Sequence, residues 1–350
     1  MKKTAAVVIL LLTTLVLLAL LEAMAMVGLK GNGQAFPFLI NYSRSTELAD
    51  AKSIGFDEIN PLWGWNMSAA KLQQKGFDTH RGLIVLRSEH ATDSSLRLFI
   101  TGGSTSDLAI DSNNWPMALH RLLNEQGMEH TIFVGAVGGF NSAQEYLRLI
   151  EIGLSLRPHL HISYSGANET GDFGFATEYE KDFYTQALNR QRTTFLAPNL
   201  IYFIRHHLLP ASPDVTLSSL PEIKTAERFK KNLGLMRAAA RQFDYRYIGI
   251  LQPLRGMGHY RQTEGKSFNM DYLEDYKKYY PTMQQWVKQY PDELFDFTAI
   301  FDTASSAVYY DDCHLLPAYQ STVAKNILQC LSLTAVDTAA TNRLSHAPVQ

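Results

Sequence analysis

Cysteine is scarce in this chain. Cys313 and Cys330 are the two cysteines among 350 residues, too few for the dense disulfide framework of small secreted domains. A helix predicted over Pro317–Cys330 would be about 20 Å long at 1.5 Å per residue. Disulfide-bonded cysteines have Cα atoms only about 4.4–6.8 Å apart. Because Cys313 precedes this helix and Cys330 ends it, we predict two free thiols.

An excess of charge of either sign is also lacking. The chain has 32 Lys and Arg against 34 Asp and Glu, a formal net charge of -2. Nucleic-acid-binding proteins are typically basic, so we expect no nucleic acid partner. Internal repeats and low-complexity segments are absent too, which excludes a repeat architecture. The 46% hydrophobic content suits a globular protein with a substantial core, and the length allows one large domain or two small ones.

The N-terminus carries a long apolar run behind two positive charges. Lys2 and Lys3 precede Ala5–Leu29, which Glu22 alone interrupts, and this pattern is typical of an export signal. A membrane-spanning helix needs about 20 largely apolar residues. We therefore expect residues 1–29 to be a signal anchor, with the lysines cytoplasmic and the rest of the chain outside, in the periplasm or extracellular space. Ala23-Met24-Ala25 offers a cleavage site for the alternative, a secreted protein.

Strand and helix patterns alternate over residues 96–333, which we predict to form the main domain. We expect a connector and surface-packing segment over residues 30–95, a short strand within Gly76–Arg87, and a flexible tail over residues 334–350. Alternation of this kind predicts parallel βαβ units with right-handed crossovers. The predicted strands are Leu98–Ile100, Thr131–Val134, Pro158–Ser165, Tyr245–Leu251 and Leu294–Ile300, and the predicted helices are Asn113–Gly127, Ala143–Gly153, Ala226–Phe243, Met270–Tyr290 and Pro317–Leu331. Asp172–Ser219 is the least regular part, and we expect helical pieces and loops over the carboxyl edge of the sheet there.

Each of the first three strands ends in a residue that suits chemistry. The first runs into Gly102-Gly103-Ser104-Thr105, a turn that presents a hydroxyl at the sheet edge where open α/β sheets place their ligands. The second ends at Gly138-Gly139, where a backbone N–H approaches a ligand without a Cβ in the way. The third ends at Asn168, whose side-chain amide is a donor.

A base and an orienting acid stand just before the final helix. Histidine is the usual base for a serine hydroxyl, and a carboxylate orients its ring. Asp311 and His314 are three residues apart, so one turn brings them into contact, with the second ring nitrogen left for Ser104. Asp312 is an alternative orienting acid.

Taken singly, each of these signals is more often structural. A Gly-Gly-Ser-Thr turn is usually a turn, an Asp-x-x-His pair is usually a structural hydrogen bond, and His159 and His161 are more often packed histidines than metal ligands. The nucleophile elbow Gly-x-Ser-x-Gly of α/β-hydrolases is not matched, because Ser106 stands where its last glycine belongs. The G-x-G-x-x-G fingerprint of dinucleotide-binding folds is not matched either. All the signals together, in this order, favour a catalytic site.

The constellation resembles the SGNH hydrolase family of GDSL-type lipases and esterases, named for four blocks with Ser, Gly, Asn and His. The resemblance runs from about Leu96 to Leu331. It implies a flavodoxin-like three-layer α/β/α sandwich of about five parallel strands. It also implies a nucleophile at Ser104, an oxyanion hole from the Ser104 and Gly139 N–H groups and Asn168, and catalytic roles for Asp311 as the orienting acid and His314 as the base. Glu169 replaces the usual Asp after the block's Asn, and Val134 replaces the Asn that commonly opens the second block.

We therefore expect a serine esterase or deacylase that works through an acyl-enzyme on Ser104. Neither a metal nor a cofactor is expected. The expected substrate is a carboxylic ester, and an outward location suggests an acylated glycan or lipid. An O-acyltransferase acting on an exported glycan and a non-catalytic envelope protein that keeps the fold are the two alternatives.

Overall fold

The computed structural model describes residues 2–30, 58–60, 64–169, 225–260 and 270–333, together with residue 204. Two compact units divide the chain: Met1–Phe56 with Ala176–Glu222, and Asp57–Phe175 with Ile223–Gln350. The second unit holds the sheet and every candidate site residue. The expectations for Asp172–Ser219 and for the tail after residue 333 fall outside the described residues, except at residue 204.

A seven-stranded sheet forms the centre of the second unit, in the order β3-β4-β6-β5-β7-β8-β9. The five strands from β6 to β9 in this order are parallel, as predicted. Their order is that of flavodoxin-like sheets, in which the chain reverses its direction of growth beside the first parallel strand and a ligand crevice opens at the carboxyl ends there. The strands are β3 (Asp78–His80), β4 (Leu83–Arg87), β5 (Leu96–Gly102), β6 (His130–Val134), β7 (Leu160–Ser165), β8 (Arg246–Leu251) and β9 (Leu294–Asp296).

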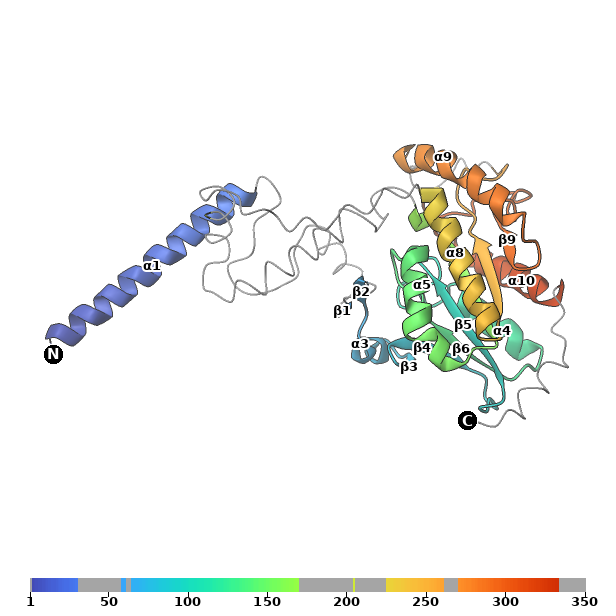
Figure 1. The fold of residues 1–350 in the computed structure, drawn as a ribbon, viewed down its shortest axis with the longest axis horizontal. Helices are drawn as coiled ribbons and strands as arrows, with labels where there is room; N and C mark the ends of the chain where they lie inside the picture. Colours follow the sequence, from blue (N-terminus) through green and yellow to red (C-terminus); the bar gives the residue numbers. More distant parts are fainter. Residues whose placement is uncertain are drawn as a thin grey trace. The chain divides into compact units, whose positions relative to one another are not determined.

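Helices cover both faces of the sheet, as the α/β sandwich prediction requires. Helices α5 and α8 pack side by side on one face, where α9 packs against α8, and helices α4 and α10 pack together on the other (Figure 1). The fold class read from the sequence is thereby confirmed. The helices are α4 (Trp115–Glu125), α5 (Ser142–Glu151), α8 (Thr225–Gln242), α9 (Met270–Val287) and α10 (Pro317–Leu333), with one-turn helices η1 (Gly153–Leu156) and η2 (Ala167–Glu169).

Two antiparallel strands extend the sheet beyond the parallel set. The sequence predicts a connector over residues 30–95 with one short strand in it, and residues 78–87 of that range form β3 and β4. Strand β4 pairs antiparallel with β6, so the hairpin protects an edge that would otherwise expose unpaired backbone groups. Ahead of it lie the short helix α3 (Ala69–Gln74) and a two-stranded ribbon of β1 (Glu58–Asn60) and β2 (Gly64–Asn66).

Strand β5 lies in the middle of the sheet, and its sequence explains why. Leu98, Phe99 and Ile100 are each fully buried, because helices cover both faces of a parallel strand and both sets of side chains enter the core. The apolar run therefore does not alternate with polar residues. The strand ends at Gly102, and the polar turn that follows brings Ser104 to the carboxyl edge.

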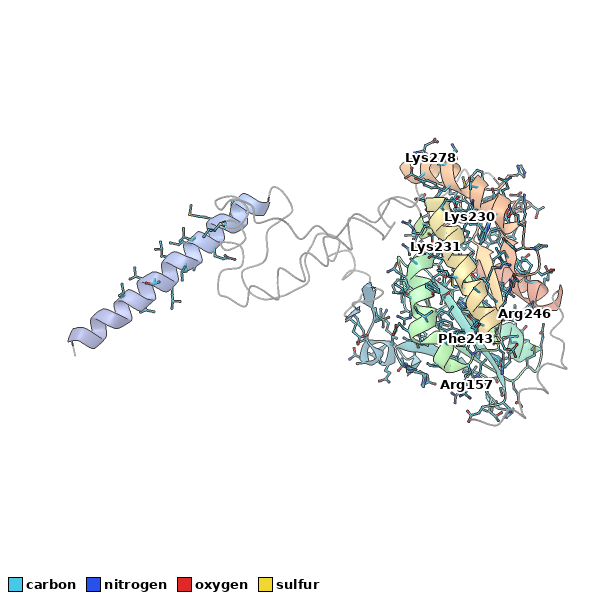
Figure 2. The ribbon with its side chains drawn as sticks, viewed as in Figure 1. Arg157, Lys230, Lys231, Phe243, Arg246 and Lys278 are labelled. Atoms are coloured by element: carbon cyan, nitrogen blue, oxygen red, sulfur yellow. The ribbon has the colours of Figure 1, made fainter. Side chains whose placement is uncertain are left out.

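Helix α8 separates an apolar face from a basic one, and its position agrees with the helix predicted over Ala226–Phe243. Phe229, Leu233 and Met236 are fully buried, whereas Lys231 is exposed. Figure 2 shows Lys230 and Lys231 on the side of α8 that is turned away from the sheet. The apolar face of the helix thus packs into the core, and Lys231 stays in solvent.

Helix α1 covers Lys2–Lys30, the range of the expected signal anchor. Within the residues that the structure describes, we find no helix whose length and apolar character suffice for a membrane crossing. The expected anchor therefore stays a prediction from sequence. The two cysteines are both free thiols, as predicted.

Candidate active site

Ser104, His314 and Asp311 form a continuous chain of short contacts at the carboxyl edge of the sheet. Ser104 Oγ lies 2.8 Å from His314 Nε2, and His314 Nδ1 lies 2.8 Å from Asp311 Oδ2. Ser104 follows β5 and the pair precedes α10, so the fold joins residues that are 210 positions apart. The geometry is that of a hydroxyl, a base and an orienting carboxylate.

Asp311 holds the turn on which His314 lies, hereafter the acid–base turn (Asp311–His314). Its Oδ1 accepts backbone N–H bonds from Cys313 at 3.0 Å and from His314 at 2.8 Å, which leaves Oδ2 for the histidine ring. Tyr310 N–H donates to the His314 carbonyl at 2.8 Å and closes the turn. The carboxylate that contacts His314 is thus that of Asp311, and the alternative, Asp312, accepts the Arg255 N–H through its carbonyl.

The contact between Asp311 and His314 shifts the pKa of both side chains. Burial favours the neutral form of Asp311, but hydrogen bonds from His314 and Cys313 outweigh it and lower the carboxyl pKa to about 2. Burial likewise lowers the pKa of His314, but attraction to Cys313 and the bond to Asp311 outweigh it and raise that pKa above its ordinary value. The side chains of both are 34% exposed, so the pair exchanges protons with solvent. The electrostatics favour an ionised acid and a strongly basic imidazole.

We call Ser104, Gly139 and Asn168 the oxyanion side, because the sequence predicts that their N–H donors form the oxyanion hole. Asn168 Nδ2 donates to the Phe140 carbonyl at 2.8 Å, which fixes the amide and leaves its second N–H. Gly139 has φ +80°, a left-handed conformation that favours glycine. In the part of the chain that the structure describes, we find no hydrogen bond from the Ser104 or Gly139 N–H.

The three loops of the oxyanion side approach one another closely at Gly103. A Cβ placed on Gly103 would lie 2.3 Å from Asn168 Nδ2 and 3.2 Å from the Phe140 carbonyl oxygen. No side chain fits there without displacing the asparagine. The glycine before the nucleophile is therefore required by close packing against Asn168.

The residues predicted from the sequence meet at one place, and the structure adds others. Asn114 Nδ2 donates to the carbonyls of Ser104 and Asp107, each at 3.1 Å. Gln320, on α10, donates to Asn114 Oδ1 at 3.2 Å. This chain of hydrogen bonds joins the turn at residues 102–105, hereafter the nucleophile turn, to α10, the helix that follows His314. In the sequence, Asn114 is marked only by its place at the start of the predicted helix Asn113–Gly127, and its side chain makes no capping bond.

A buried ion pair supports the turn that carries Asn168. Glu169 is fully buried, accepts the Ser142 N–H at the start of α5 and lies 3.8 Å from Arg228 of α8. Arg228 also donates to the Glu169 carbonyl at 3.0 Å. Burial raises the pKa of Glu169, against the opposing effect of Arg228. Glu169, which replaces the Asp usual in this family, thus fixes the backbone beside Asn168 through bonds from Ser142 of α5 and Arg228 of α8.

His159 and His161 take structural positions. The Arg97 N–H donates to His159 Nδ1 at 3.0 Å. His161 is fully buried, with Nε2 2.9 Å from Thr101 Oγ1, and Thr101 in turn donates to Glu145 at 2.9 Å. Neither histidine contacts Ser104, His314 or Asp311 in these hydrogen bonds. The reading of both as packed side chains agrees with their surroundings.

Metal-ligand spacing occurs once among the described residues. The ligand atoms of Asp311, Cys313 and His314 all lie within 4.8 Å of one another. Two of these side chains already form the acid–base pair, and a metal on His314 Nδ1 would replace the bond to Asp311. The arrangement is better suited to proton transfer than to metal binding.

Comparisons with known proteins give similarity only at the level of solved structures. No family model and no curated protein sequence matches the chain. An acetyl xylan esterase, AlAXEase, covers 67% of this chain and 100% of its own at 13% identity and TM-score 0.44. TesA covers 68% and 99% at 14% identity and TM-score 0.39.

A GDSL-like lipase from Parabacteroides merdae covers 67% of this chain and 95% of its own at 10% identity and TM-score 0.44. Identities this low speak to the fold alone, and we base the function on the geometry of the site.

Proposed function

We propose that the protein is a serine esterase that hydrolyses carboxylic esters through an acyl-enzyme on Ser104. The observation that carries this proposal is the Ser104–His314–Asp311 chain, with both contacts at 2.8 Å. The half-exposed oxyanion side, which has two backbone N–H groups without a protein partner among the described residues, supports it.

In the first step, His314 takes a proton and Ser104 forms a bond. With its own proton on Nδ1 toward Asp311, the ring accepts the Ser104 proton at Nε2 as Oγ attacks the ester carbonyl carbon. The carbonyl oxygen becomes an oxyanion and is stabilised by the Ser104 N–H, the Gly139 N–H and Asn168 Nδ2. The imidazolium then gives the Nε2 proton to the leaving alkoxide as the C–O bond breaks.

In the second step, water replaces the alcohol. His314 accepts a proton from water as the water oxygen attacks the acyl-enzyme, and the same donors hold the second oxyanion. The Ser104–acyl bond breaks, Ser104 takes the proton back and the carboxylic acid leaves. A hydroxyl acceptor in place of water would make the same site an acyltransferase, so product analysis with and without a polyol acceptor distinguishes the two activities.

Ester hydrolysis by the full chain and two variants tests the proposal. With p-nitrophenyl acetate and longer acyl homologues, Ser104→Ala and His314→Ala should each lose on the order of 10⁴-fold or more in kcat. The exposed residues Ser94 and His90 provide matched controls, and Ser94→Ala and His90→Ala should retain activity. Hydrolysis by Ser104→Ala at the wild-type rate would overturn the proposal.

We also propose that residues 1–29 direct export of the catalytic domain. Lys2 and Lys3 before an apolar run support this, as does the helix over Lys2–Lys30. Fractionation of cells that express the full chain or a chain without residues 1–29 tests it. Export of both forms, or of neither, would contradict it.

A further inference from the structure

Asp107 is a buried carboxylate that bridges the nucleophile turn and the loop after β6 at residues 135–139, hereafter the glycine loop. Its side chain is buried, with the residue only 3% exposed. Oδ1 accepts the Ala109 N–H at 2.8 Å, and Oδ2 accepts the Gly138 N–H at 3.0 Å across 31 residues. One side chain thus ties the loop after Ser104 to the residue that precedes Gly139.

The Asp107 backbone is itself fixed to the nucleophile. Its N–H donates to the Ser104 carbonyl at 3.3 Å, and Asn114 donates to the carbonyls of both residues. Lys75 adds a bond to the Ala109 carbonyl at 2.9 Å. A shift of Asp107 relative to Ser104 would break several of these bonds at once.

The glycine loop uses its other N–H groups for anchoring. Gly135 donates to the Ile100 carbonyl at 2.7 Å and Val137 donates to the Gly102 carbonyl at 3.1 Å. Gly138 donates to Asp107, and the next N–H in the chain, that of Gly139, has no partner among the described residues. The bond to Asp107 is therefore the last fixed point before the N–H that faces a substrate.

Burying a carboxylate is costly unless its hydrogen bonds compensate. Burial raises the pKa of Asp107 to about 6, although the N–H groups of Ala109 and Gly138 lower it. A neutral side chain would satisfy a simple turn at lower cost. An ionised carboxylate accepts N–H bonds at both oxygens, which a carboxamide cannot do.

We infer that Asp107 is a positioning residue, which holds the Gly139 N–H at the place where the oxyanion forms on Ser104. This inference rests on the proposed esterase function. Asp107 itself contacts none of the reacting atoms and acts through Gly138. The expected signature is a loss of transition-state stabilisation with substrate binding little changed.

Asp107→Asn is the test variant, because it keeps the shape but turns one acceptor into a donor that faces a backbone N–H. Asp111 provides a matched control, because its Oδ1 accepts the Asn113 N–H at 2.9 Å in the same segment without reaching the glycine loop. We expect Asp107→Asn to lower kcat about 10- to 100-fold with KM nearly unchanged. Asp111→Asn should leave both unchanged.

Two further measurements on the full chain separate positioning from general loss of structure. A trifluoromethyl ketone, which forms an oxyanion on the serine, should lose affinity in Asp107→Asn by the same factor as kcat. Hydrogen exchange should become faster at the Gly138 amide in Asp107→Asn and stay unchanged in Asp111→Asn.

Two results would overturn the inference: faster exchange at Gly138 with unaltered kcat and ketone affinity, or unaltered exchange. A wild-type protein that neither hydrolyses esters nor binds the ketone would refute the esterase proposal instead, whatever the exchange result. The exchange measurement in that case still decides whether Asp107 holds the loop.

Discussion

The two sides of the site are held in different ways. Behind the oxyanion side lie two buried carboxylates, Asp107 and Glu169, which accept backbone N–H groups from Gly138 and Ser142. The acid–base turn is held by Asp311, which is 34% exposed and bonds mainly within its own turn. Burial raises the pKa of the first two carboxyl groups, whereas hydrogen bonding lowers that of Asp311.

This difference in how the carboxylates are held matches the chemical roles that we propose for the two sides. An oxyanion hole works by fixed dipoles that need no rearrangement during the reaction, and buried anchors with several bonds provide such fixity. In the proposed mechanism the acid–base turn gains and loses a proton in each step, which requires contact with solvent and a charge partner for the imidazolium. We therefore expect changes on the acid–base turn to alter pH dependence, and changes on the oxyanion side to alter rate alone.

The largest effect is expected from Asp311→Asn. The base must be neutral to accept the Ser104 proton, so the rate rises with pH through the pKa of His314. That pKa is raised. The rising limb of the wild-type rate–pH profile should therefore lie above pH 6.5, the ordinary histidine value. Without the carboxylate the pKa falls, the limb moves to lower pH, and the plateau drops by about 10⁴-fold because the ring loses its orientation.

A kcat–pH profile of wild type and Asp311→Asn checks this prediction. Asp312→Asn is the matched control on the same turn, and its limb should coincide with that of wild type. An Asp311→Asn limb that does not move would show that Asp311 plays no part in the ionisation of His314.

Asn168→Ala should lower kcat less than Asp311→Asn does, without shifting the rate–pH profile. One donor of the oxyanion hole is removed, which typically costs about 10²–10³-fold in kcat. Because no group that titrates with His314 changes, the pH limb should keep its position. Asn124, on the surface of α4, offers a control in Asn124→Ala, and a shifted limb in Asn168→Ala would break the distinction between the two sides.

Gly103→Ala tests whether close packing of the backbone against Asn168 positions the amide on the oxyanion side. The added methyl group would meet Asn168 Nδ2 and push the amide away from the oxyanion. A displacement of about 1 Å costs on the order of 10²-fold in rate. In a chain that already carries Asn168→Ala, Gly103→Ala should therefore add little further loss. Additive losses in the double variant would contradict a steric route through Asn168.

The smallest expected effect on catalysis comes from Glu145→Gln, beneath the sheet edge. Glu145 is fully buried and accepts from Thr101 and Ser165, and burial raises its pKa to about 7. A raised carboxyl pKa stabilises the fold most below pH 4.5 and progressively less as pH rises to about 7, by on the order of 3 kcal/mol in total.

Urea unfolding of wild type and Glu145→Gln between pH 5 and 8 measures this. The free energy of unfolding should decrease with pH in wild type more steeply than in the variant, with kcat nearly equal in both. Equal slopes would show that Glu145 does not bind its proton more tightly in the folded protein.

Much of this arrangement was predictable because strand ends and turns leave local signals. The apolar run of β5, the glycines after it and the Asp-x-x-His spacing place Ser104, Asp311 and His314 on the correct elements. Crossover rules for parallel strands then bring them to one edge. These features depend on residues close in sequence or on general topology.

The supporting residues were not predictable in this way. Asp107 reaches Gly138 and Gln320 reaches Asn114 across long separations, and nothing in the local sequence marks either pairing. The β3–β4 hairpin likewise joins the sheet through pairing with β6, a tertiary contact that short strand patterns do not specify. What escapes prediction is the set of side chains that hold the catalytic residues in place.

Covalent labelling of Ser104 tests the central claim most directly. A fluorophosphonate should form one adduct per chain, located by mass spectrometry on Ser104, and the labelling rate should fall at least 100-fold in His314→Ala while His90→Ala labels like wild type. An adduct elsewhere, or a labelling rate that is the same in His314→Ala, would contradict a nucleophile at Ser104 activated by His314.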